Sequence, residues 1–136
     1  MAHEFHIYIK SDKQPSMSSI ARALSSRGFS FAFTDDTPLH ERGTDIGLSV
    51  DGNSQAVSVS SVDAGSPTWA ELAASAQDRP DGETLLKVMK NTNRRITLTA
   101  DGEASRWARD VSRGTALLAV GAFENVEKSS LIFYGG

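Results

Sequence analysis

The stretch Glu4-Phe5-His6-Ile7-Tyr8-Ile9-Lys10 decides the fold expected for this chain. Its odd positions are apolar and its even positions are polar or amphipathic, which is the period of two typical of a strand with one buried face. We therefore expect Phe5, Ile7 and Ile9 to point into the core. The opposite face carries Glu4, His6, Tyr8 and Lys10, and we expect it to be exposed to solvent if helices cover only one side of the sheet.

This strand opens a strand-helix-strand unit that has a counterpart near the other end of the chain. After Pro15 and Ser16, apolar residues at helical spacing predict a helix that Gly28 closes, and Phe29, Phe31 and Phe33 then alternate as a second strand. The later unit consists of a strand at 95–99, a helix beginning near Asp101 and a last strand at 131–134. For residues 115–123 the pattern permits helix or strand, and we favour strand, with Gly114 as a candidate helix end.

The middle of the chain predicts a hairpin and two short helices. Alternating apolar residues at 46–50 and 57–62 flank the turn residues 51–54, while Ser66 and Pro67 begin one helix and residues 80–82 separate it from the next. Together these elements predict one α+β domain over residues 1–136. Its sheet is mixed but largely antiparallel, its helices lie mainly on one face, and its strand-helix-strand units are ferredoxin-like.

The composition excludes several classes of function. The 136 residues include no cysteine, so disulfides, thiolate nucleophiles and cysteine-ligated metals are ruled out. No apolar run is long enough to span a membrane. The net charge of −3 argues against nucleic-acid binding, which depends on neutralising phosphates. Residues 1–5 show neither the basic lead nor the apolar run of a secretory signal, so we expect a cytoplasmic protein.

The segment from Thr34 to Asp45 has no periodicity and holds the densest set of ionisable groups in the chain. Its acids suit a hard cation, or His40 could act as a base beside one of them, but the spacing fits no EF-hand loop. A protein-binding loop and an ordinary solvated loop are the other interpretations. We expect no metal and no cofactor. The ionisable residues are Asp35, Asp36, His40, Glu41, Arg42 and Asp45.

A basic stripe on the helix after Asp101 is a weaker candidate. Arg106, Arg109 and Arg113 share one helical face, and Arg94 and Arg95 lie in the preceding strand. The set could meet phosphates or an acidic surface, or it could be a solvated helix face.

No motif for catalysis or phosphate binding is present, so the leading expectation is a non-enzymatic protein-binding module. Examples are a small acidic inhibitor and an immunity-type protein that neutralises a toxin by covering its active surface. The partner would be another protein with a basic surface, and an open sheet edge would also permit a homodimer. One alternative is an enzyme that pairs His6 or His40 with Asp35, Asp36 or Glu41, and another is a ligand-sensing regulatory domain. The expected partner-binding residues are Asp35, Asp36, His40, Glu41 and Asp45, together with Glu4, His6 and Tyr8.

Overall fold

The computed structural model describes residues 2–41 and 45–135, and in them the strands form one antiparallel sheet with the order β2-β3-β4-β5-β1-β6-β7. The first strand of the chain therefore lies inside the sheet, between β5 and β6. The strands are β1 (Ala2–Ile9), β2 (Phe31–Phe33), β3 (Asp45–Val50), β4 (Asn53–Asp63), β5 (Arg94–Asp101), β6 (Ala122–Asn125) and β7 (Ser130–Phe133).

The α-helices begin where the sequence predicts. The Ser16 hydroxyl accepts the backbone N–H of Ser19 at the start of α1, and Ser66 does the same for Trp69 at the start of α2. None of the helices in the described part of the chain has the length and apolar content to cross a bilayer. The helices are α1 (Met17–Ser25), α2 (Pro67–Ser75), α3 (Gly82–Asn91) and α4 (Gly102–Leu118).

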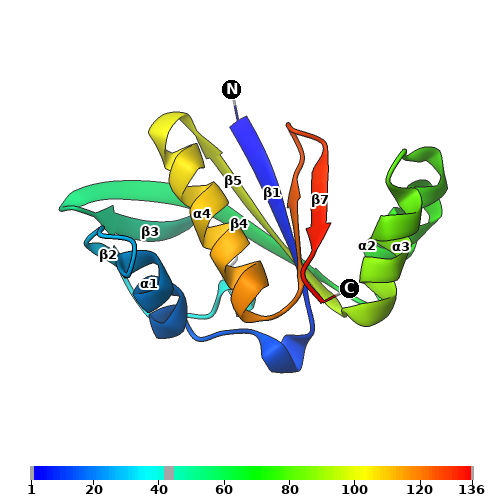
Figure 1. Cartoon of the computed structure of the whole chain (residues 1–136), viewed down its shortest axis with the longest axis horizontal. Helices are drawn as coiled ribbons and strands as arrows, with labels where there is room; N and C mark the ends of the chain where they lie inside the picture. The colour runs from blue at the N-terminus through cyan, green and yellow to red at the C-terminus, as the bar shows by residue number, and fades with distance from the viewer. Residues whose placement is uncertain (1, 42–44, 136) are drawn as a thin grey trace.

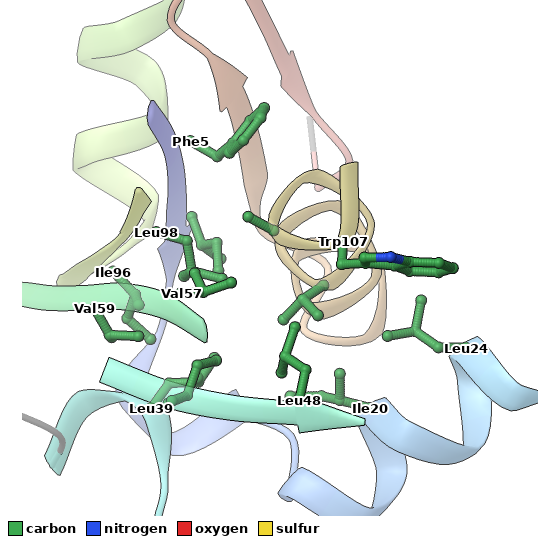
Figure 2. Close-up of a cluster of buried hydrophobic side chains, with 14 of the residues drawn as sticks. Phe5, Ile20, Leu24, Leu39, Leu48, Val57, Val59, Ile96, Leu98 and Trp107 are labelled. Carbon is green, nitrogen blue, oxygen red and sulfur yellow. The ribbon is translucent and has the colours of Figure 1, made fainter. Parts of the chain in front are cut away.

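The main core lies on the sheet face covered by α1 and α4. Phe5, Ile7 and Ile9 are buried there, as the alternation in β1 predicts. Figure 2 shows Leu24 of α1 beside Trp107 of α4, and Ile20 of α1 beside Leu48 of β3. The expected α+β class, with a largely antiparallel sheet, is confirmed; the narrower ferredoxin-like description is not.

The other face of the sheet carries a second, smaller core at one end. There α2 and α3 pack on Tyr8, Ala122 and Phe133, which share a face because they are paired in register across β1, β6 and β7. Figure 1 shows the two helix groups on opposite sides of the central strands, with α1 at one end of the molecule and α2 with α3 at the other. This second layer leaves the part of the face formed by β3, β4 and the start of β1 uncovered.

The prediction of a strand over residues 115–123 is wrong for most of that segment. Helix α4 continues through Gly114 to Leu118, and β6 begins only at Ala122. The helix ends in a Schellman motif in which Gly121 N–H donates to Ala116 C=O at 2.8 Å and Val120 N–H donates to Leu117 C=O at 3.2 Å. Val120, with φ of 52°, occupies the left-handed position that glycine usually takes.

Candidate functional site

The structure divides the expected partner-binding residues between the two faces of the sheet. His6 and Tyr8 lie on the face opposite the main core, and Glu4 and Asp45 lie on that face as well, because register pairs Asp45 with Ser58, Ser58 with Thr99 and Thr99 with Glu4. Residues 34–41 of the loop lie on the α1 side, where Leu39 is buried in the main core. The two sets therefore do not form one continuous site.

The loop is anchored more firmly than a free polar loop. A short 3₁₀ helix, η2 (Leu39–Glu41), fixes its centre, and Gln14 Nε2 donates to His40 Nδ1 at 2.9 Å. The Gln14 amide oxygen accepts in turn from Arg94, which pairs with Asp63. Asp36 and His40 line a hollow beside the start of α1, and Glu41 Oε1 lies 3.7 Å from His40 Nε2. Arg42 lies outside the described residues.

His6 is the central residue of the second face, and it is buried rather than solvent-facing. Only 7% of it is exposed, because it lies between β5 and β6, where it pairs in register with Thr97 and Glu124. Its Nε2 is 3.0 Å from Glu4 Oε1 and its Nδ1 is 2.7 Å from the Thr97 hydroxyl. Since a carboxylate can only accept, the ring proton is assigned to Nε2, and the Thr97 hydroxyl donates to Nδ1.

The surroundings of His6 keep it neutral. Burial lowers its pKa to about 3, and the positive charges of Arg95 and Arg79 act in the same direction. Glu4 opposes this shift, but its side chain is 48% exposed and solvent screens its charge. Both ring nitrogens are already hydrogen-bonded, and a pKa so far below neutrality makes a poor general base. The geometry therefore favours a positioning role for His6 over acid-base catalysis.

Tyr8 is also enclosed, which corrects the expectation that its row faces solvent. The side chain is fully buried beneath α2 and α3, where its ring meets Trp69 edge-on. Its hydroxyl lies 3.4 Å from Glu124 Oε1. Burial and the Glu124 charge raise the pKa of Tyr8 to about 12, so the phenol is protonated at neutral pH.

Glu124 and Asp81 share one guanidinium. Arg79, in the connection between α2 and α3, donates through Nε and Nη2 to both carboxylate oxygens of Asp81 at 2.8 Å, and through Nη2 to Glu124 at 2.5 Å. These bonds hold the pKa of Arg79 above its ordinary value and that of Asp81 below it. The buried Glu124 therefore has a counter-ion.

Arg95 differs from Arg79 because it has no carboxylate partner among the residues that the structure describes. It pairs in register with Tyr8 and lies on the same sheet face. Its Nε is buried without a hydrogen-bond partner, and no Asp or Glu within residues 2–41 and 45–135 forms an ion pair with it. A buried donor without a partner costs about 1–3 kcal/mol. Arg95 does act on the neighbouring Tyr8 hydroxyl, by its charge and by a side-chain hydrogen bond. It therefore has a polar neighbour, but no carboxylate of residues 2–41 and 45–135 balances its charge.

These groups surround a pocket of about 350 Å³ at the boundary of the covered region. Its polar lining consists of His6, Arg79, Asp81, Arg95 and Glu124, and Ser129 adds a further residue at the turn between β6 and β7. Leu72, Pro80 and Val126 supply apolar surface. A pocket with convergent polar groups and residues of perturbed pKa is the usual form of a ligand site.

Beside the pocket, the uncovered sheet carries small side chains and two acids, a set that we call the serine face. Its Ser58 hydroxyl donates to Asp45 at 2.9 Å. Asp45 and Glu4 lie at opposite ends of one register row, separated by three strand spacings, or about 14 Å. The serine face consists of Glu4, Asp45, Ser54, Ala56, Ser58, Ser60 and Thr99.

Sequence reasoning misses most of the pocket. Glu124 is not among the expected site residues, yet it lies in β6 at the pocket and is only 5% exposed. The sequence also groups Arg95 with the arginines of α4; in the structure Arg94 pairs with Asp63, and Arg109 and Arg113 lie beside Asp110. The alternation of Arg95, Thr97 and Thr99 with Ile96 and Leu98 does place Arg95 on the polar face, but only the strand register places it next to Tyr8.

The described residues contain no group of three or more His, Asp or Glu side chains positioned to hold a metal ion. Comparison with known protein families, characterised proteins and solved structures gives no match to this chain.

Proposed function

We propose that this protein is a non-enzymatic binding module that engages another protein through the serine face. The observation that carries the proposal is the kind of side chain on this open surface. Ser54, Ala56, Ser58 and Ser60 of β4 are all exposed, and none is long or charged. An ordinary solvated strand face more often carries Lys, Glu or Arg.

Small side chains favour association because they lose little conformational entropy when they are buried. The serine face also carries two acids, Glu4 and Asp45, so a basic surface on the partner would complement it. The net charge of −3 agrees with this. We infer that the protein acts by covering that surface, as an inhibitor or an immunity-type protein does. As part of this proposal it works in the cytoplasm, since a chain without cysteine needs no oxidising compartment to fold.

The test compares two serine variants that add the same side chain. Ser58→Lys places a long cation at the centre of the serine face, whereas Ser26→Lys adds it at the exposed C-terminal end of α1, a helix that packs on the opposite face of the sheet. A cation is compatible with that end of a helix, because the helix dipole is negative there. The tagged wild-type chain is used to capture a protein from extracts of its source cells, and the dissociation constant of the purified pair is then measured by calorimetry.

We expect Ser58→Lys to weaken the complex about tenfold or more, because it adds like-charge repulsion and steric overlap, while Ser26→Lys binds as the wild type does. Failure to isolate any partner, or equal binding by both variants, would contradict the proposal.

A further inference from the structure

We propose that the pocket beside His6 is a binding site for a carboxylate carried on a short apolar chain, with Arg95 as its counter-ion. The proposal concerns a small ligand group and does not depend on the serine face binding a protein.

The first step is the state of Arg95. The pocket lining contains two arginines, and Arg79 is already engaged by Asp81 and Glu124. Arg95 forms no ion pair with any described residue. Because its Nε is buried, a ligand in the pocket can reach only the terminal Nη groups. Those groups form a planar pair of donors that matches the two oxygens of a carboxylate.

The second step is the charge of the ligand. Glu124 and Asp81 line the same pocket, and Glu4 lies next to His6. Arg79 offsets only part of this negative charge. A dianion such as phosphate would therefore meet repulsion from these acids, whereas a monoanion can pair with Arg95 at a smaller electrostatic cost. The neutral His6 ring adds no charge to the site.

The third step is the size and polarity of the rest of the ligand. A volume of about 350 Å³ is at the small end of ligand pockets. Leu72, Pro80 and Val126 provide apolar contact around the charged groups. The pocket therefore fits a few methyl or methylene groups attached to the carboxylate. A free small acid and the terminal carboxylate of a polypeptide both have this chemistry.

The experiment follows the Leu72 and Val126 methyl signals by nuclear magnetic resonance during titration with butyrate and with its neutral analogue butyramide. We expect saturable shifts with butyrate and none with butyramide, because the paired charge supplies the difference in affinity. A parallel titration with N-acetyl-leucine distinguishes the two sources of the carboxylate. If N-acetyl-leucine binds more tightly than butyrate, the ligand is the C-terminal end of a polypeptide; if it binds more weakly, the ligand is a free small acid.

Two variants connect the signal to Arg95. Arg95→Gln should weaken butyrate binding about tenfold or more, which corresponds to losing one charge-assisted pair. Arg106→Gln, on the exposed face of α4, should leave it unchanged. An unaltered amide spectrum establishes that each variant is folded. Absence of a shift with both acids in the wild-type protein, or equal binding by Arg95→Gln, would overturn the proposal without bearing on the serine face.

Discussion

His6 illustrates how far the physical properties of one residue depend on its neighbours. In the sequence it is one of the polar positions of an alternating strand, and the alternation correctly predicts its side of the sheet. Its burial depends on distant parts of the chain, since its strand neighbours Thr97 and Glu124 and the pocket residues Leu72 and Arg79 surround it. Local pattern therefore predicts the face but not the solvent exposure, the hydrogen bonds or the shifted pKa.

The lowered pKa of His6 predicts how stability depends on pH. The unfolded chain binds a proton near pH 6.5 and the folded chain only near pH 3, so the contribution is complete above pH 6.5 and is lost as the pH falls toward 3. Between pH 7 and 5 we expect the free energy of unfolding to decrease by about 2 kcal/mol from this residue. Urea unfolding at several pH values measures it.

His6→Gln provides the control, because glutamine retains hydrogen-bonding groups and does not titrate. This variant should lose most of the pH dependence between pH 5 and 7. The same slope in both proteins would show that other groups are responsible.

At the scale of single elements, α4 shows what helix patterns can and cannot predict. Its start after Asp101 and its buried stripe follow directly from the sequence. Its end does not, because glycine is the usual left-handed residue at a helix end and Gly114 is the available candidate. The chain instead places Val120 in that position, and only the backbone hydrogen bonds identify the true end of the helix.

Val120→Gly should stabilise the protein by about 1 kcal/mol. A β-branched residue is strained at a φ of 52°, and glycine relieves that strain. The Val120 side chain is 61% exposed, so its removal loses few packing contacts. Thermal and chemical unfolding of the variant test this expectation. A loss of stability would mean that contacts of the Val120 side chain outweigh the backbone strain.

Replacing two glycines of this region with alanine should change the stability of the protein in opposite directions. Gly114 lies in the helix interior with open space around the added carbon, so Gly114→Ala should stabilise by about 0.5–1 kcal/mol. At Gly121 the added carbon would lie 2.1 Å from the Tyr8 carbonyl oxygen, so Gly121→Ala must separate β1 from the chain entering β6 and should destabilise strongly. Urea unfolding measures both effects. The midpoint of Gly114→Ala should lie above that of the wild type, and the midpoint of Gly121→Ala should lie below it.

For the whole molecule, the two cores predict two levels of stability. The main core joins α1, α4 and most of the sheet, whereas the second core holds α2 and α3 through a much smaller set of buried residues. Helix α2 itself contains no buried residue. The general class of fold follows from the alternation of its strands and helices, but the division into two layers requires the three-dimensional packing.

Hydrogen exchange should therefore be faster in α2 than in β1 and β5. We expect amides of residues 67–75 to exchange through local opening, and those of the central strands only through global unfolding. Mass spectrometry of deuterated protein measures both. Equal protection of the two regions would show that the layers unfold as one unit.

The central position of β1 also determines when this domain can be completed during its synthesis. Of the strands in this sheet, β1 is translated before the others, whereas both of its neighbours, β5 and β6, come late in the order of the strands. At ordinary translation rates the nascent chain carries this apolar strand unpaired on both edges for roughly 5 to 20 seconds. Until residues 94–125 have emerged, both edges of β1 are open to association with other chains.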